Sequence, residues 1–254
     1  MGRNKLVLNS DKTRLLIMTS SKQHRNHQNF NITLDTGTEI IQPVSEERLL
    51  GGVVSNDLKW NNHVQDNKKS LIVILTSRVN ALSKVSRFSS FKVRKMIADG
   101  VVMSYLVYLI QLYGGCSEFL LSALQVLQNR AANLVTRLGW RTPVRTLLLQ
   151  CGWLSIRQLV VFHSILLLFN TRQTKKPTYI HSKISQDFNL RTRLATSFGI
   201  KDTRMLEKTT AQQSFIPRTV KIWNERLPAE LRTETALKIF KTKLKTWVKE
   251  NVKI

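Results

Sequence analysis

Acidic residues are scarce in this chain. Its 254 residues hold 16 Asp and Glu against 40 Lys and Arg, which gives a formal net charge of +24 at pH 7 and an isoelectric point near 10.6. Such an excess of one sign destabilises a compact chain through self-repulsion unless a polyanion screens it. We therefore expect a polyanionic partner, either nucleic acid or an anionic membrane.

Long apolar runs and cysteines are also few. The longest apolar stretches, residues 101–113 and 159–169, are too short for a bilayer and contain polar residues. Nucleic acid, and not a membrane, is thus the expected partner. Cys116 and Cys151 lie far apart, and no signal peptide precedes them. We expect free thiols in a reducing compartment and an intracellular location, in the nucleus or cytoplasm.

No cluster of metal ligands stands out. Polymerases hold two metal ions with clustered aspartates, whereas the acidic residues here are scattered and their one adjacent pair is Glu46 and Glu47, which we interpret as solvated. His24 and His27 have the spacing of helical ligands, but their polar surroundings favour a surface loop over a zinc site. We expect no catalytic residue, no metal site and no cofactor.

Patterns for a nucleophile or a phosphate loop are equally weak. Cys116 or Cys151 with His163 would supply a thiol and a base, but His163 shares a helical face with apolar residues, which favours a core or boundary histidine. The pairs at residues 51–52 and 114–115 are glycines that lack the Lys-Ser/Thr of a phosphate loop. We interpret them as turn or close-packing glycines.

Periodicity divides the chain into three regions and predicts a mainly α fold with a small N-terminal β element. Residues 1–60 hold short apolar runs between turns, which is typical of strands. Residues 61–174 show helical periodicity, and residues 175–254 combine a basic, loop-rich segment with a C-terminal amphipathic helix. The expected strands are Thr13–Met18, Phe30–Leu34, Glu39–Ile41 and Leu49–Val54.

The central region predicts a helical bundle. Three helices each carry an apolar stripe, and a fourth, Ile156–Asn170, is apolar nearly all round, which argues for burial. The stripes are Val64, Leu71, Leu75, Val79 and Leu82 in Asn62–Ser86; Ile97, Val101, Tyr105, Tyr108 and Leu112 in Phe91–Tyr113; and Leu120, Leu124, Leu127, Ala131, Leu134 and Leu138 in the third.

The last region begins where Lys175-Lys176-Pro177 ends the helical pattern. A polar stretch follows that we expect to be loop-rich, a linker or a lid, and its basic residues are Arg191, Arg193, Lys201, Arg204 and Lys208. The chain closes on a predicted amphipathic helix, Thr235–Val252. One face of that helix carries Leu237, Phe240, Leu244, Trp247 and Val248, and the other Lys238, Lys241, Lys245 and Lys249.

Two groups of basic residues predict a nucleic-acid-binding face. Arg contacts phosphate oxygens with its planar fork and Lys as a point charge, and the extreme net charge favours binding over a merely solvated surface. One group is Arg130, Asn133, Arg137, Arg141 and Arg145, and the other is Lys84, Arg87, Lys92, Arg94 and Lys95. We interpret Trp60, Trp140, Trp153 and Trp223 as core anchors and not as base-stacking residues.

Five sequence blocks carry a resemblance to a known family. In order they are NKLVLNSDKTRLLIM, RLLGGVVSNDLKWNNHV, LSALQVLQNRAANLVTRLGW, LLLQCGWLSIRQLV and WNERLPAELRTETALKIFKTKLKTWV. Their order resembles the C-terminal part of the reverse transcriptase of a non-LTR (LINE-type, jockey-like) retrotransposon, over nearly the whole chain.

The resemblance implies a partial palm-like β element over 1–60, a thumb-like bundle over 61–174 and a basic extension over 175–254. Asn9–Thr13 is similar to a block that follows the paired palm aspartates, so we expect the catalytic aspartates to be absent. Leu50, Gly51 and Gly52, with Leu58, Trp60 and His63 after them, resemble the primer-grip hairpin and the entry to the thumb. Leu127–Ala131 is similar to a block of the following helical region.

Together these observations predict a catalytically incomplete reverse-transcriptase-like fragment, not an enzyme by itself, that binds RNA or an RNA–DNA hybrid through the backbone. The sequence does not distinguish RNA, DNA and hybrid. Three alternatives stay open. The chain is part of an active RNA-directed DNA polymerase whose palm and fingers lie on a separate upstream polypeptide, or a protein-interaction module that uses a sheet edge and the C-terminal helix, or a translated relic without a function.

Overall fold

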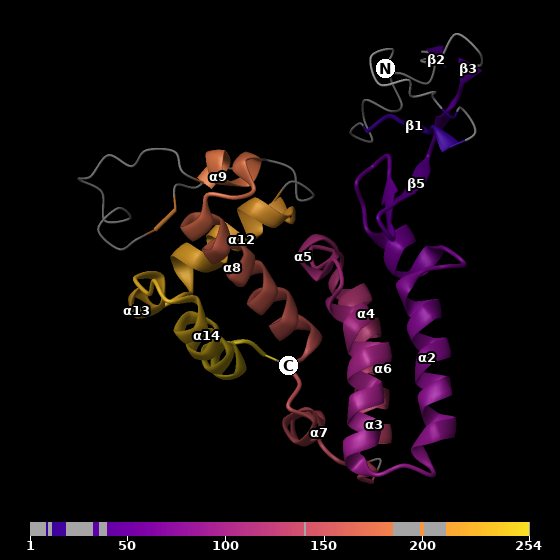
Figure 1. The fold of residues 1–254 in the computed structure, drawn as a ribbon, viewed down its shortest axis with the longest axis vertical. Coiled ribbons are helices and arrows are strands. Elements are labelled where there is room, and N and C mark those ends of the chain that lie inside the picture. The colour runs from indigo at the N-terminus through magenta and orange to yellow at the C-terminus, as the bar shows by residue number, and fades with distance from the viewer. Residues whose placement is uncertain are drawn as a thin grey trace. The chain divides into compact units, whose positions relative to one another are not determined.

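The computed structural model describes residues 9, 12–18, 33–35, 40–139, 141–184, 199–200 and 212–253 (Figure 1). Within these residues the chain is mainly helical with small two-stranded sheets near the N-terminus, which confirms the predicted fold class. The chain divides into two units, residues 1–70 and 71–254. The predicted region boundaries at residues 60 and 174 stay predictions.

Three two-stranded sheets make up the described part of the first unit. Strand β1 (Leu15–Leu16) pairs in parallel with β4 (Pro43–Val44). Strand β2 (Leu34–Asp35) pairs antiparallel with β3 (Ile40–Ile41). Strand β5 (Glu46–Leu49) pairs antiparallel with β6 (Gly52–Ser55), with Leu49 opposite Gly52.

The β5–β6 hairpin corrects one prediction. Leu49–Val54 is not a single strand, because the chain turns back at Leu50 and Gly51, where φ is 48° and 83°. Two consecutive residues with positive φ form the two-residue hairpin turn that matches the twist of the flanking strands. Gly51 is therefore the turn glycine that the sequence predicts, while Leu50 occupies a conformation that glycine or asparagine usually adopts.

The predicted helix Asn62–Ser86 is broken. A π-helical turn, η3 (Asn62–Asp66), ends before residues 67–70, and α2 (Leu71–Ser86) begins after them. The core face was predicted correctly: Val64 in η3 and Leu71, Leu75, Val79 and Leu82 in α2 are all buried. The break falls in the polar Asn67-Lys68-Lys69-Ser70 stretch, where Asn67 forms a turn with Ser70.

Helix α6 (Glu118–Thr136) is the centre of the next part of the second unit. It packs against α2 and α3 (Phe91–Ala98), with η4 (Asp99–Met103), α4 (Ser104–Val107) and α5 (Ile110–Tyr113) completing the chain between them (Figure 1). The predicted stripe of α6 is buried at Leu120, Leu124, Leu127 and Ala131, so this helix and its face are confirmed. Leu134 and Leu138 are partly exposed.

The predicted helix Phe91–Tyr113 is segmented, and its predicted core face is wrong. Val102, Leu106 and Ile110 are fully buried, whereas Tyr105, Tyr108 and Leu112 are exposed. Two apolar stripes, each with a spacing of four residues, lie next to each other on this segment. The apolar pattern therefore did not show which of the two is buried. The buried stripe begins at Arg94, which patterning counts as a surface residue.

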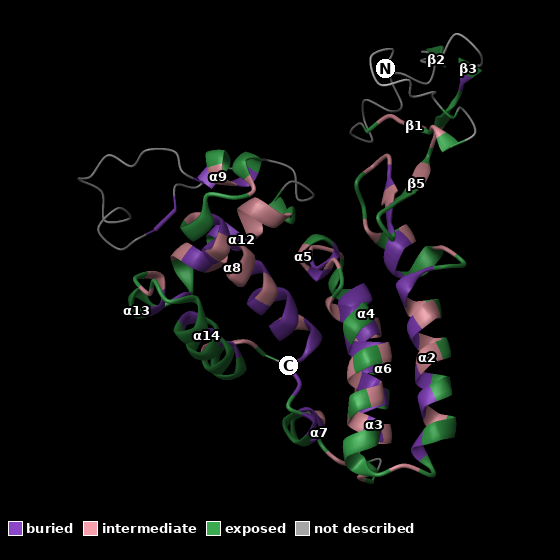
Figure 2. Cartoon of the chain, viewed as in Figure 1, coloured by how far each residue is buried: buried purple, intermediate pink, exposed green. Residues whose placement is uncertain are grey.

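Helix α8 (Ile156–Thr174) is the core of the remaining part. Its N-terminus has a capping box made by Ser155 and Gln158, and it is buried on nearly all sides, as predicted (Figure 2). It contacts α5, α6, α9 (Thr178–Ile184), α12 (Phe215–Glu225) and α14 (Leu237–Asn251). The Phe169 ring stacks on Phe240 with centroids 3.8 Å apart.

Several elements were not predicted: α7 (Val144–Cys151), α9, α12 and α13 (Ala229–Arg232). The predicted C-terminal helix is confirmed as α14, with Phe240, Leu244 and Val248 fully buried, although Leu237 is exposed. The predicted basic residues Arg191, Arg193, Lys201, Arg204 and Lys208 lie outside the described residues.

No single helix in the described ranges has the length and apolar composition of a membrane span. The pair α7 and α8 has that length and composition only when the two are taken together, and the pair is bent by 48°.

Two glycines provide a test of this packing. A Cβ on Gly114 would lie 2.5 Å from the Ile110 carbonyl oxygen and 2.7 Å from Val160, whereas a Cβ on Gly100 would meet nothing within 4 Å. Gly114→Ala is therefore expected to lower the free energy of unfolding by about 1–3 kcal/mol through overpacking. Gly100→Ala is expected to raise it by about 0.5–1 kcal/mol, because glycine is the more flexible residue in the unfolded chain.

Urea denaturation of both variants measures the difference. Equal stabilities for the two alanine variants would contradict the close approach of α5 and α8 at Gly114, which the sequence predicts only as a close-packing glycine.

Candidate nucleic-acid interface

The two predicted basic groups meet at one end of the α2, α3 and α6 helices. Arg137, just after α6, donates from Nη2 to the Ser86 carbonyl at the end of α2. Arg94 in α3 donates from Nε to the Val135 carbonyl in the last turn of α6, at 2.8 Å. Residues that are about 50 positions apart in the sequence therefore share one surface (Figure 1).

We call this surface the basic tip. Its cations come from the last turn of α2, the α2–α3 loop, the start of α3, the residue after α6, the α6–α7 connection and the first turn of α7. They are Lys84, Arg87, Lys92, Arg137, Arg141 and Arg145, and all six are exposed.

Arg94 is the exception among the predicted residues. Its side chain is only 6% exposed, and its guanidinium donates to the Ser89 and Val135 carbonyls. Loss of hydration and the nearby Arg137 charge both lower the pKa of Arg94. The residue joins the α2–α3 loop to α6, so it is already engaged inside the protein, and we leave it out of the proposed phosphate-binding surface.

Lys95 is also engaged. Its Nζ lies 2.6 Å from Asp99 Oδ2, and the other oxygen of Asp99 accepts a 2.6 Å hydrogen bond from Trp153 Nε1. This ion pair compensates the Lys95 charge next to the tip. Trp153 is buried, as expected of a core anchor.

Arg130 and Asn133 lie further from the end of α6. Arg130 is exposed and donates from Nη2 to Asn80 Oδ1 on α2, at 2.9 Å. Asn133 is partly buried, and its Oδ1 has no hydrogen-bond partner in the described part of the chain. Arg130 extends the basic surface along the side of α6, whereas the side-chain oxygen of Asn133 is buried.

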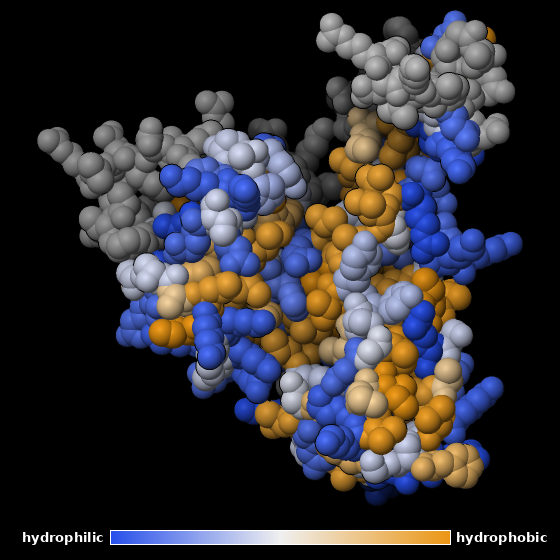
Figure 3. Space-filling view, viewed as in Figure 1, coloured by the Kyte–Doolittle hydropathy of each residue, from blue (hydrophilic) through white to orange (hydrophobic). Residues whose placement is uncertain are grey.

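Few carboxylates offset this charge. Between Asp66 and Asp187 the acidic residues are Asp99 and Glu118. Asp99 is held by Lys95 and Trp153, and Glu118, at the opposite end of α6, pairs with Arg157. The connection from α2 to α3 lies at the bottom of the view in Figure 1. Figure 3 shows hydrophilic side chains next to hydrophobic ones at the bottom of the same view.

Phe88, next to Arg87 on the α2–α3 loop of the basic tip, was not predicted from the sequence as a binding residue. This ring is 91% exposed on the α2–α3 loop. The loop is ordered by several hydrogen bonds: the Phe88 N–H and the Ser89 hydroxyl both donate to the Val85 carbonyl, and Arg94 and Arg137 hold the Ser89 and Ser86 carbonyls. The sequence does indicate an exposed ring here, because Phe88 does not fit the apolar stripe of α2 and directly follows Arg87.

The hairpin predicted to resemble a primer grip has its own exposed apolar turn. Leu50 is 81% exposed and Leu49 lies exposed next to it, whereas Gly52 is buried. Leu58 is exposed, and Trp60 is partly buried, with its ring in a T-shaped contact with the His63 ring. The role of this hairpin stays a prediction.

The paired glutamates at the hairpin are less solvated than predicted. Glu46 accepts hydrogen bonds from Asn62 Nδ2 at 2.5 Å and from Asn67 Nδ2 at 3.0 Å, which ties β5 to the polar residues around η3. Glu47 lies 3.8 Å from Arg14 Nε. Among the described residues, no three His, Cys, Asp or Glu side chains come together in a group suited to a metal ion. His24 and His27 lie outside those residues.

Cys116 and Cys151 are free thiols, and no described hydrogen bond joins either of them to His163. Burial raises the pKa of Cys116 and of Cys151 to about 11, so both stay protonated at neutral pH. His163 is partly buried, with its ring edge-on to Phe162, and burial followed by the Lys241 charge lowers its pKa. It is the boundary histidine that the sequence predicts. Trp223 is a fully buried anchor, and Trp140 lies outside the described residues.

In three comparisons, no protein-family model, no curated protein and no solved structure matches the chain.

Proposed function

We propose that this chain binds RNA or an RNA–DNA hybrid through the sugar–phosphate backbone, with the basic tip as its contact surface. The binding corresponds to what the resemblance implies for the thumb of a reverse transcriptase, and we propose that the chain transfers no nucleotides by itself. The observation that carries the proposal is that Arg94 and Arg137 join the ends of α2, α3 and α6, so that exposed cations from separate segments of the chain lie at one end of these helices.

The construction of the tip supports this proposal. Arg forks and Lys point charges at the ends of three helices contact phosphates without regard to sequence. Hydrogen bonds from Arg94 to the Ser89 carbonyl and from Arg137 to the Ser86 carbonyl hold the α2–α3 loop in place. A loop that is already ordered loses little conformational entropy when it binds, so its cations are presented at low cost.

Phe88 adds a stacking contact. An exposed aromatic ring among cations is the arrangement by which proteins hold unpaired bases, worth about 1–3 kcal/mol per base. Phe88→Ala is therefore expected to weaken binding of a single-stranded RNA by roughly 5- to 150-fold. The salt dependence is expected to stay unchanged, because no charge is lost. Fluorescence anisotropy with a labelled oligonucleotide measures both quantities.

Phe119→Ala is the matched control. Phe119 is 71% exposed and lies at the opposite end of α6. Its removal is expected to change the affinity less than twofold. An equal loss in both variants would show that Phe88 has no special role at the tip.

Photo-crosslinking of an RNA–DNA hybrid carrying a 4-thiouridine in its RNA strand tests the location of the interface. Peptides from the α2–α3 loop and from the α6–α7 connection are expected to dominate the crosslinked products. Crosslinks confined to other segments would refute the basic tip as the interface.

The proposal that the chain completes a polymerase with a separate palm polypeptide has its own test. Primer extension with Mg²⁺ is expected to be absent for the chain alone and to appear only on mixing with such a polypeptide. Nucleotide incorporation by the purified chain would overturn the proposal that it is not an enzyme by itself.

A further inference from the structure

A small cavity lies between the end of α8 and the connection from α13 to α14. Its volume is about 210 Å³, and its lining residues are Phe169, Arg172, Gln173, Arg232, Thr233, Glu234 and Thr235. A cavity needs only about 10–15 Å³ to hold one water molecule, so this one has room for a small anion. Most of the lining side chains are polar.

Arg172 is the main feature of this cavity. Its guanidinium is partly buried and lies 5.1 Å from the centroid of the Trp223 ring. No hydrogen bond or ion pair joins it to any other described residue, and burial lowers its pKa. A charge that is partly withdrawn from water and has no counter-charge is unfavourable, and an anion placed against it offsets this cost.

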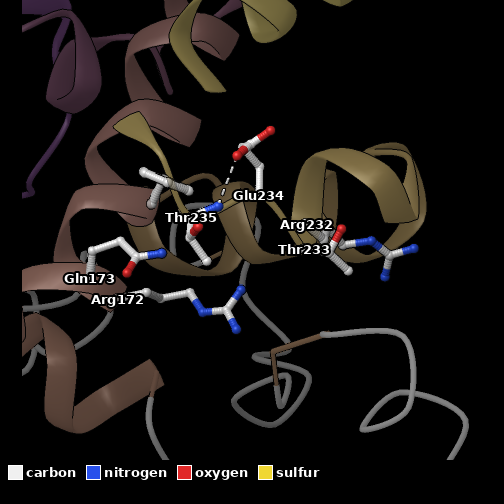
Figure 4. Close-up of a pocket in the computed structure, with 7 residues that line it drawn as sticks. Arg172, Gln173, Arg232, Thr233, Glu234 and Thr235 are labelled. Atoms are coloured by element: carbon white, nitrogen blue, oxygen red, sulfur yellow. Dashed lines mark hydrogen bonds between the residues drawn. The ribbon is translucent and has the colours of Figure 1, made fainter. Parts of the chain in front are cut away.

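The carboxylate of the cavity does not serve as that anion. Glu234 accepts hydrogen bonds from the Thr235 and Ala236 N–H groups, both at 3.2 Å, and forms an ion pair with Lys243 at 3.0 Å. Figure 4 shows its carboxylate directed away from the Arg172 guanidinium. The negative charge of Glu234 is thus compensated by other groups.

The remaining polar groups are donors or carry positive charge. Figure 4 shows Arg172 and Gln173 extending from α8 toward the 233–235 segment. Gln173 has an exposed amide, and Thr235 an exposed hydroxyl, whereas the Thr233 hydroxyl already donates to the Glu230 carbonyl. Arg232 adds a second positive charge to the lining.

We propose that this cavity binds a phosphate group, with Arg172 as the main ligand and with Gln173 and the Thr235 hydroxyl as further donors. A planar guanidinium donates two parallel hydrogen bonds to phosphate oxygens, which matches the chemistry of the site. The phosphate comes either from inorganic phosphate or from the terminal phosphate of a nucleic-acid strand. This site is separate from the basic tip and does not depend on the function proposed for it.

Calorimetric titration with inorganic phosphate tests the site. Arg172→Gln is expected to weaken phosphate binding at least tenfold. Lys245→Gln, which removes one exposed charge from α14, is expected to change it less than twofold. Equal phosphate affinities in the wild type and both variants would show that only the general net charge attracts phosphate, and would overturn the proposal.

Arg172→Lys provides a second variant that keeps the charge and the aliphatic stem. It is expected to bind phosphate several-fold more weakly than the wild type, because the fork is lost. This variant decides the question if Arg172→Gln does not fold. Unchanged affinity in Arg172→Lys would overturn the role assigned to the guanidinium.

The source of the phosphate is identified with two oligonucleotides that differ only in a 5′-phosphate or a 5′-hydroxyl. Tighter binding of the phosphorylated strand by the wild type but not by Arg172→Gln would assign the site to a strand end. Equal binding of both strands, with Arg172-dependent binding of inorganic phosphate, would assign it to the free anion. If no probe depends on Arg172, the proposal fails while the basic tip is unaffected.

Discussion

Replacing Lys84, Arg87 and Lys92 together with Gln is expected to weaken binding of an RNA–DNA hybrid by about 30- to 100-fold at low salt. Each cation that neutralises a phosphate releases condensed counterions, and the three losses are expected to reduce the slope of log K against log salt by about 2.7. All three side chains are exposed and make no ion pair with a described residue. Their removal is therefore expected to leave the fold intact.

A triple variant on α14 is the control. Lys238, Lys241 and Lys249 are exposed, and replacing them with Gln removes the same charge from another surface. This control is expected to lose less than threefold in affinity. Equal losses in the two triple variants would show that the overall charge attracts the hybrid, and not the basic tip.

Arg94→Met is expected to lower the free energy of unfolding by about 3 kcal/mol. The substitution keeps most of the aliphatic stem but removes the donors to the Val135 and Ser89 carbonyls. A hydrogen bond from a charged group contributes about 1.5–3 kcal/mol, and a buried acceptor left without a partner costs about 1–3 kcal/mol. Urea denaturation at equilibrium measures the loss.

Lys92→Met, two residues away on the exposed side of α3, is the control for this variant. It is expected to stay within about 0.5 kcal/mol of the wild type, as surface substitutions usually do. If Arg94→Met were as stable as Lys92→Met but lost one unit of salt slope in hybrid binding, Arg94 would belong to the binding surface, as the sequence first indicated.

The helices that the sequence predicts best are those with one unambiguous apolar face. The α6 stripe at Leu120, Leu124, Leu127 and Ala131 has no competitor, so both the helix and its buried side were predictable. Between Phe91 and Tyr113 two apolar stripes compete, and the one that Arg94 begins is buried. Arg94 is buried because its guanidinium donates hydrogen bonds to two backbone carbonyls. The apolar periodicity of the sequence does not reveal such hydrogen bonds.

The elements that escaped prediction begin near prolines. Helix α7 follows Pro143, and Pro217 lies in the first turn of α12. Proline interrupts a helical pattern when the sequence is scanned, but it is tolerated where the first N–H groups have no helical partner. The Phe215–Glu225 segment therefore appeared to be loop, although Trp223 anchors it in the core.

The candidate site was predicted as residue types but not as a surface. The sequence indicated two separate basic groups, and only the packing of α6 against α2 and α3 brings them together through Arg94 and Arg137. The same contacts show that the buried Arg94 holds the loop, whereas Arg137 also contacts the loop but stays exposed in the basic tip. Phe88 was overlooked because a lone aromatic residue between two helices has no periodic partner, and its exposure is a property of the tertiary fold.

Equilibrium binding of an RNA–DNA hybrid across a series of salt concentrations tests the central claim most directly. If the six cations of the basic tip neutralise about six phosphates, log K is expected to fall with log salt at a slope of roughly −5. Affinity in the micromolar range at physiological salt is expected with it. A flat salt response would contradict backbone binding by the basic tip.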